Sequence, residues 1–270
     1  MPNPETPGFL TAADGTPLHG IYHAPAGEAK GVCVIAPPLF EERKSAYGGL
    51  TLLARALAER GFGAFRFDFR GSGESGGDAG QRRWNHLVED LKTAGDAARQ
   101  LAKDVPVTLI GTRLGGTLAL AHSSAVNAKA VVAIAPVLKG ATEVRLWRLR
   151  SKMRAELSGK ENEQTNAPST TKGEILDLDG FPVAKSFFED LKPVDLLGAS
   201  QQAAIPTLVI QVSHREKASG EYERLQEQLG APARLACIRA LPFWERVDDA
   251  DVSGIAECVL EFVTQLITDR

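Results

Sequence analysis

The residues Gly111-Thr112-Arg113-Leu114-Gly115 have the glycine spacing of a turn that holds a catalytic nucleophile. An apolar run precedes them and an Ala- and Leu-rich stretch follows, so the sequence predicts a strand, a tight turn and a helix. Enzymes with this G-x-S-x-G turn attack their substrates with its central serine. Here the central residue is Arg113. Because a guanidinium stays protonated and does not attack a carbonyl carbon, the turn keeps its frame without a nucleophile.

The two partners of such a nucleophile, a histidine base and an acid that orients it, are also missing from their expected places. The histidine belongs after the last strand, where the chain has Trp244, and none of the 5 histidines lies there. The acid belongs after the strand of residues 207–212, where Glu216 is at best a displaced candidate. We therefore assign no catalytic residue and treat Arg113, Glu216 and Trp244 as degenerate triad positions. Ser45, Ser123 and Cys33 could replace the missing nucleophile, but the sequence indicates no base for any of them.

Backbone donors and a positive charge remain at this turn. The amides around Leu39 and Phe40, with that of Leu114, are expected to form an oxyanion hole. The amino end of the following helix adds a positive dipole, and Arg113 adds a guanidinium that suits a carboxylate or phosphate. In the alternative, Arg113 pairs with a nearby glutamate and fills the former site, and the sequence favours neither interpretation. The candidate ligand-binding residues are Arg113, Leu114, Leu39, Phe40, Glu41, Glu42 and Trp244.

The chain around these residues alternates between strand and helix patterns, which predicts an α/β fold with a mostly parallel central sheet flanked by helices. We expect eight or nearly eight strands, with the strand 107–110 central because it has no polar face to give to solvent. Strands are expected at 18–23, 31–36, 62–69, 107–110, 130–135, 207–212 and 233–239. Helices are expected at 46–60, 84–102, 117–121, 216–229 and 252–267.

Residues 137–190 break this alternation, and we expect them to form a helical lid inserted into a core of residues 1–136 and 191–270. Leu146, Leu149, Met153 and Leu157 share one face of a helix, and arginines and a lysine surround them. We interpret this helix as part of a lid with a solvated charged face, in preference to a helix on an anionic membrane. The polar stretch 158–172 is expected to be a mobile loop.

The composition argues against several classes of function. A net charge of −3 provides no basic field for nucleic acid. The 3 cysteines match neither a metal site nor a disulfide framework, so we expect no metal and no cofactor. No apolar run reaches the roughly 18 residues that would span a bilayer, and no signal segment is visible. The expected location is therefore the reducing cytoplasm.

Several motifs carry a family resemblance. Residues 37–45 resemble P-P-F-x-E-E-x-x-K-S, residues 111–115 resemble G-L-R-L-G, and residues 242–244 resemble part of P-P-F-W. With the lid start at residues 135–140, they resemble the α/β-hydrolase superfamily and, more narrowly, the bacterial exosortase A system-associated hydrolase 2 group. Residues 68–77 are similar to the superfamily's D-x-R-G-x-G-x-S turn, where Asp68 and Arg70 are expected to form an ion pair. The resemblance implies an α/β-hydrolase fold and a setting beside an exopolysaccharide and protein-sorting system, but no particular reaction.

Three functions are consistent with these residues. The preferred one is a non-catalytic protein that binds a small anionic or acyl ligand. The second is a hydrolase with relocated chemistry, in which Glu41 or Glu42 activates water beside Arg113. The third is a subunit that binds a partner protein, or a second copy of itself, through the basic lid.

Overall fold

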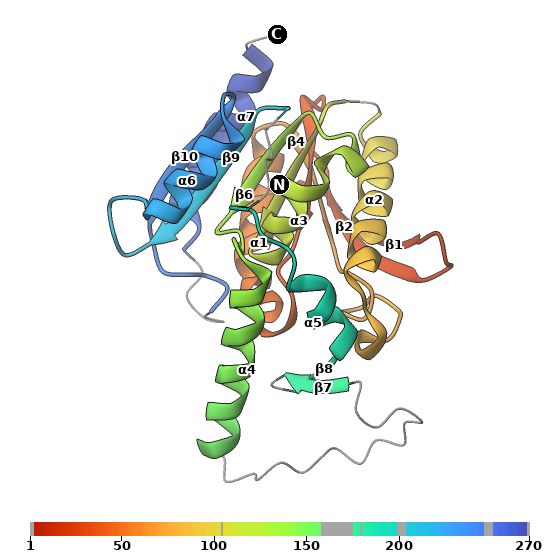
Figure 1. Cartoon of the computed structure of the whole chain (residues 1–270). Coiled ribbons are helices and arrows are strands. Elements are labelled where there is room, and N and C mark those ends of the chain that lie inside the picture. Colours follow the sequence, from red (N-terminus) through yellow and green to blue (C-terminus); the bar gives the residue numbers. More distant parts are fainter. Residues whose placement is uncertain are drawn as a thin grey trace.

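The computed structural model describes residues 3–103, 105–157, 175–178, 180–198, 204–245 and 251–268 of the chain. An eight-stranded sheet of order β1-β2-β4-β3-β5-β6-β9-β10 runs through its centre (Figure 1). The six strands from β4 to β10 in this order are parallel to one another, whereas β2 is antiparallel to β1 and β4. The sheet strands are β1 Glu5–Thr11, β2 Pro17–His23, β3 Gly31–Ala36, β4 Phe62–Phe67, β5 Val107–Thr112, β6 Ala130–Ile134, β9 Thr207–Ser213 and β10 Ala233–Arg239.

The predicted α/β fold, the number of strands and the central position of β5 are confirmed. All six side chains of β5 are buried, as the apolar run requires. The sequence did not predict β1, whose side chains are almost all exposed and so have no apolar pattern. Within the described chain, β1 borders the sheet beside β2.

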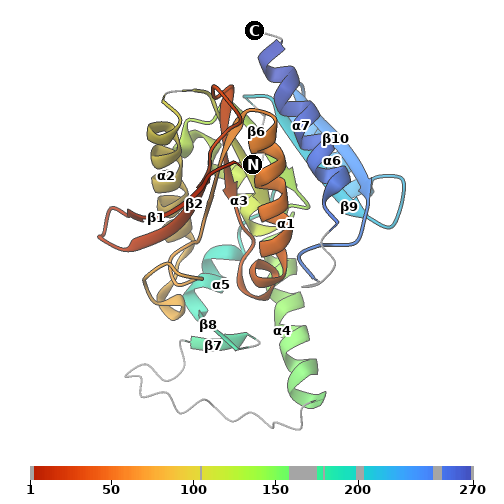
Figure 2. The same ribbon diagram turned by 180° about the vertical axis from the view of Figure 1, so that it is seen from behind.

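Helices cover both faces of the sheet (Figures 1 and 2). On one face, α1 (Phe40–Glu59) and α7 (Ser253–Thr268) pack together against the strands. On the other face lie α2 (Trp84–Leu101), α3 (Leu114–His122) and α6 (Gly220–Leu229). Two short 3-10 helices, η1 (Ala79–Gln81) and η2 (Ser123–Val126), lie in the connections.

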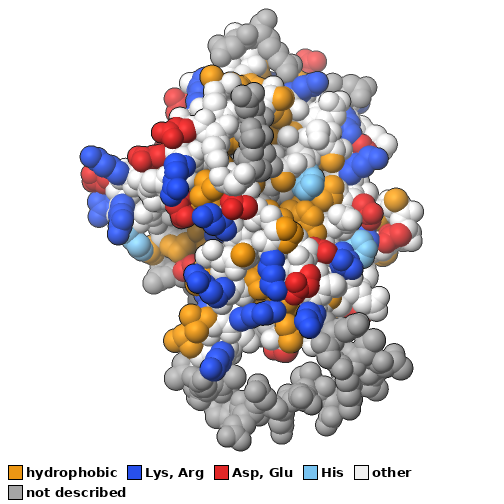
Figure 3. Space-filling view, viewed as in Figure 1, with side chains coloured by type: hydrophobic (Ala, Val, Ile, Leu, Met, Phe, Trp, Pro, Cys, Tyr) orange, Lys and Arg blue, Asp and Glu red, His pale blue; other side chains and the backbone are white. Residues whose placement is uncertain are grey.

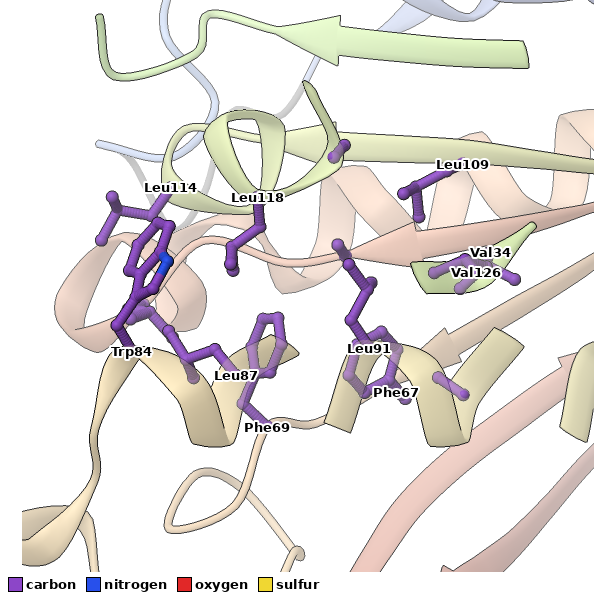
Figure 4. Close-up of a cluster of buried hydrophobic side chains, with 14 of the residues drawn as sticks. Val34, Phe67, Phe69, Trp84, Leu87, Leu91, Leu109, Leu114, Leu118 and Val126 are labelled. Atoms are coloured by element: carbon purple, nitrogen blue, oxygen red, sulfur yellow. The ribbon is translucent and has the colours of Figure 1, made fainter. Parts of the chain in front are cut away.

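A cluster of apolar side chains under α2 and α3 supports the turn after β5 (Figure 4). Leu87 and Leu91 of α2 face Leu118 of α3, and all three are fully buried. Phe69 and Leu109 belong to the same cluster. The apolar positions three and four residues apart in α2 therefore form its packing face, as its sequence pattern predicts.

Three helix starts differ from the sequence-based expectation, and one of them is that of α3, which begins at Leu114 rather than at residue 117. Helix α1 begins at Phe40 rather than at residue 46, because its first turn carries acidic side chains instead of the apolar repeat. Helix α6 begins at Gly220 rather than at residue 216. The Ser219 amide there donates to the Gln211 side chain at 2.8 Å, which holds the preceding residues outside the helix. None of the described helices is long and apolar enough to cross a membrane.

Between β6 and β9 the chain forms an inserted segment, defined here as α4 (Gly140–Leu157), β7 (Ile175–Leu178), β8 (Phe181–Ala184) and α5 (Lys185–Leu191). Figure 1 shows it beyond the carboxyl ends of the parallel strands. Trp147 of α4 packs against Phe40 and Phe188, with ring centroids 5.3 and 6.2 Å apart. Asp190 of α5 accepts two hydrogen bonds from Arg83 at 2.6 and 2.7 Å. These contacts support the proposal that the segment is a lid, and its boundaries at residues 137 and 190 stay a prediction.

The inserted segment leaves and rejoins the core at one place. The amide of Gly140 donates to the Val194 carbonyl at 2.8 Å, and that of Leu196 donates to Leu138 at 2.8 Å. A Cβ atom at Gly140 would lie 1.9 Å from the Leu191 carbonyl oxygen, so only glycine permits this approach. The start of α4 and the end of α5 are thereby held together.

The apolar stripe of α4 faces outward in the described part of the chain. Leu149 and Met153 are 53% and 54% exposed, whereas Val144 and Trp147 form the packing side. Figure 3 shows Lys and Arg side chains gathered over this lower part of the molecule. Arg148 lies over the Phe188 ring, and Arg145 and Arg150 are exposed. The Leu157 side chain and the expected loop at 158–172 lie outside the described residues.

Candidate functional site

The turn between β5 and α3 has a strained backbone at its central residue. Arg113 has φ 55° and ψ −121°, a backbone conformation that residues other than glycine rarely adopt. A Cβ atom at Gly111 would lie 2.1 Å from the Gly115 carbonyl oxygen, and one at Gly115 would lie 2.3 Å from that of Ala36. Both glycines are therefore required for α3 to start this close to the sheet, and the predicted strand-turn-helix is present.

The Arg113 side chain is held on all of its nitrogens. Its Nε donates to Glu42 Oε1 at 3.0 Å, and its Nη2 donates to Glu143 Oε1 at 3.2 Å. The remaining nitrogen, Nη1, donates to the Ala135 carbonyl at 3.3 Å. The three side chains are 16%, 11% and 7% exposed for Arg113, Glu42 and Glu143. The arrangement is a largely buried ion triad that joins α1, the turn and α4.

Trp244 closes one side of this triad. The guanidinium carbon of Arg113 lies 5.7 Å from the centroid of the Trp244 ring, within reach of a cation–π interaction. Thus the residue in the expected histidine position does lie beside the residue in the expected nucleophile position. Tyr222 also interacts electrostatically with Arg113, and burial raises the pKa of its phenol to about 12.

Burial and the neighbouring charges both shift the pKa values of the triad. Burial raises the pKa of Glu42; the cation of Arg113 opposes this shift, and the second carboxylate, Glu143, adds to it. Burial acts to lower the pKa of Arg113, but Glu42 and Glu143 outweigh it and the net shift is upward. One guanidinium therefore faces two carboxylates, and the arrangement has no spare positive charge for an anion.

Comparison with known proteins decides the family. The sequence pattern of the serine aminopeptidase S33 family matches residues 27–177. The chain belongs to this α/β-hydrolase family. No curated protein sequence matches it.

Solved structures similar to this S33 member include several esterases. Est1E from Butyrivibrio proteoclasticus, solved with ferulic acid, has a TM-score of 0.68 and 17% identity over 97% of this chain and 100% of its own. An esterase from Pyrococcus furiosus has a TM-score of 0.68 and 17% identity over 97% and 91% of the two chains. The esterase domain of a Rhodothermus marinus protein has a TM-score of 0.65 and 22% identity over 97% and 98%. At these identities the likeness shows a shared fold.

The expected oxyanion-hole residues of this S33 member surround the turn. Leu39 and Leu114 are buried, at 2% and 1% exposure. No hydrogen bond within the described residues occupies the Leu114 N–H. Phe40 has a positive φ of 56°, and its ring stacks beneath the Arg82 guanidinium at 5.1 Å. The oxyanion hole at these amides stays a prediction, while the Phe40 side chain packs against Trp147, Phe181 and Phe187.

Other candidates from the sequence lie away from the triad. Glu41 is half-buried and forms no ion pair within the described residues. Glu216 is 84% exposed and lies 3.9 Å from Arg239, so it is not brought to Arg113. Burial raises the pKa of the Cys33 thiol to about 12, which keeps it un-ionised. No cluster of His, Cys, Asp or Glu in the described chain could hold a metal ion.

Glu143 is a residue of this candidate site that the sequence analysis missed. It lies in the first turn of α4 and is 5% exposed. The sequence does place Glu143 near the site: it lies in the first turn of the helix that begins at Gly140, shortly after strand β6 and the Ala135-Pro136 pair that follows it. An acidic residue in a first helical turn has an ordinary explanation in the helix dipole, however, and does not reveal its partner.

The predicted ion pair between Asp68 and Arg70 is wrong. Asp68 instead pairs with Arg43 at 2.6 Å, and Arg70 pairs with Asp90 of α2 at 2.7 Å. Arg70 reaches away from its own turn, because Asp90 accepts from both its backbone amide and its guanidinium. The turn is thus held by long-range ion pairs, which also include those of Arg70 with Asp14 and Glu89, rather than by a local one.

Proposed function

We propose that this S33-family chain is a non-hydrolytic protein that works by binding. In this proposal the nucleophile turn has become an ion-pair junction between α1, α3 and the inserted segment. The observation that carries it is that each of the three guanidinium nitrogens of Arg113 donates a hydrogen bond, to Glu42, Glu143 or the Ala135 carbonyl. A side chain held in this way neither attacks a substrate nor leaves the position free for a water molecule.

The contacts also bear on the ligand. An anion at Arg113 would have to displace Glu42 or Glu143 and leave a carboxylate unpaired in a nearly dry site, which is costly. We therefore place an acyl ligand ahead of an anionic one at this turn, beside the buried apolar side chains of Leu39, Phe40 and Trp244. The motifs shared with the exosortase-associated group support a role beside an exopolysaccharide and protein-sorting system.

A second candidate function keeps hydrolysis with relocated chemistry. It is favoured by the raised pKa of Glu42, because a buried carboxyl beside a second carboxylate is a typical general acid or base. In that case Glu42 would activate water and Arg113 would stabilise the developing charge. The second function predicts ester turnover that depends on Glu42, whereas the first predicts no turnover.

The test combines turnover with active-site labelling. We expect the purified protein to hydrolyse p-nitrophenyl butyrate no faster than a heat-treated sample and to take up no serine-directed fluorophosphonate, with a competent esterase as the positive control. Turnover that persists in the wild type and is lost in Glu42→Gln, but not in Glu41→Gln, would replace this proposal by the second candidate.

A further inference from the structure

A cavity of about 640 Å³ lies at the amino ends of the parallel strands. Its lining residues come from the first positions of β3, β4, β5, β6 and β10, and from the last turns of α7. In Figure 1 this end of the sheet lies towards the C-terminus, whereas α4 and α5 lie beyond the opposite end. The cavity is therefore separate from the site around Arg113. Its volume falls in the range of about 300–1,000 Å³ that is usual for small-molecule sites.

Small side chains on the sheet create this hollow. Gly31, Thr108 and Ala130 form its floor on neighbouring strands. Phe62 and Phe262 form apolar walls, and both are buried. Val263 and Leu266 of α7 continue the wall on the helix side. The result is an apolar trough between the sheet and the end of α7.

The rim of the cavity is basic. Lys30, Lys129 and Arg234 line it and are exposed, and no Asp or Glu is among the described lining residues. Lys30 Nζ donates to the Arg60 carbonyl at 3.1 Å, and the Arg234 guanidinium donates to the Gln265 side chain, so both have neutral partners. None of the three forms an ion pair within the part of the chain that the structure describes. No carboxylate of the described residues therefore neutralises their charges.

We propose that this cavity binds an anionic amphiphile, with its apolar body in the trough and its carboxylate or phosphate head at the three rim cations. An apolar wall alone would accept a neutral ligand equally well, whereas the unpaired cations select a negative head group. The proposal goes beyond the proposed function, because it does not depend on whether the turn at Arg113 hydrolyses esters.

The test measures binding of three probes with the same apolar chain, all below their micelle concentrations. Isothermal titration calorimetry is expected to show saturable binding of dodecanoate and dodecyl phosphate, and at least tenfold weaker binding of dodecyltrimethylammonium. Sedimentation with vesicles of anionic lipid identifies the source of the head group. Co-sedimentation without binding of the free probes would overturn the proposal of a small-molecule site.

Matched variants locate the site. Combined Lys30→Ala, Lys129→Ala and Arg234→Ala is expected to weaken dodecanoate binding roughly tenfold, since each exposed charge contributes a modest amount. Lys92→Ala, Lys217→Ala and Arg224→Ala, which remove equal charge from other exposed positions, should leave it unchanged. Leu266→Trp should block the trough and abolish binding of both probes. Equal weakening by the two triple variants, or undiminished binding by Leu266→Trp, would show that the cavity is not the site.

Discussion

Glu143 lies 3.2 Å from Nη2 of Arg113 and so joins the inserted segment directly to the turn after β5. The same guanidinium binds Glu42 of α1 on its other edge. The residue in the expected nucleophile position thus holds together three elements that come from distant parts of the sequence. Its removal should affect the stability of the whole site.

Arg113→Met should lower the free energy of unfolding by about 3–5 kcal/mol. Methionine keeps much of the bulk of arginine but leaves Glu42 and Glu143 as two nearly buried carboxylates without a counter-charge. Urea denaturation at pH 7 measures the change. Glu41→Gln is the control, since Glu41 forms no ion pair in the described structure, and it should change the free energy by less than about 0.5 kcal/mol. A near-native Met variant would instead indicate an arginine that is free to bind a ligand.

The destabilisation caused by Arg113→Met should shrink as the pH falls. The pKa of Glu42 is already raised from 4.5 in the folded wild type, chiefly by burial, and loss of Arg113 removes the cation that opposes the shift. Between pH 4.5 and this raised pKa the folded state binds more protons than the unfolded state, so stability falls as the pH rises through that window. Denaturation of both proteins at several pH values from 4.5 to 8 should show the gap widening with pH. If the difference in free energy of unfolding between the two proteins did not change with pH, unpaired carboxylates would not be the cause of the destabilisation.

Restoring a serine should not restore hydrolysis. Arg113→Ser supplies a hydroxyl on a correctly strained turn, but Trp244 stands where a base is needed, and loss of one triad member removes most of the rate. We expect p-nitrophenyl ester turnover at background for Arg113→Ser. The double variant with Trp244→His should also be inactive, because Glu216 is 84% exposed and is not placed to orient a histidine. Circular dichroism must first show that both variants are folded.

His23 should make the protein sensitive to mild acid. Burial lowers the pKa of His23 from 6.5 to about 4, and the neighbouring cation of Arg66 adds to this shift. Between these values the unfolded state binds the proton, so the free energy of unfolding falls as the pH drops from 6.5 towards 4, by on the order of 3 kcal/mol in total. His23→Gln should flatten this part of the pH profile relative to the wild type. His214→Gln, at an exposed position, should leave the profile as it is.

The parts of the fold that follow from local pattern could be predicted from the sequence. The apolar run of β5 and the glycines around Arg113 define a strand and a tight turn through sterics alone, and both are present. The helical repeat of α2 likewise defines its packing face. Each of these features depends on residues that are close together in the chain.

The partners of charged side chains could not be predicted in the same way. Arg70 was expected to pair with its neighbour in the turn, but it reaches Asp90, 20 residues away. Arg113 reaches Glu143, 30 residues away, on an element whose position relative to the sheet the sequence does not define. A charge pattern predicts that a partner is needed, whereas only the three-dimensional arrangement of elements selects it.

The two hydrogen bonds that join Gly140 to Val194 and Leu196 to Leu138 have a consequence for chain topology. Because the inserted segment begins and ends at the same point, the order and pairing of the eight sheet strands are complete without it. The segment is a single insertion whose two ends are joined by hydrogen bonds. A change in its length would therefore leave the path of the core strands unchanged. Arg113 is a second place, away from that base, where the inserted segment is bonded to the core, through Glu143 of α4.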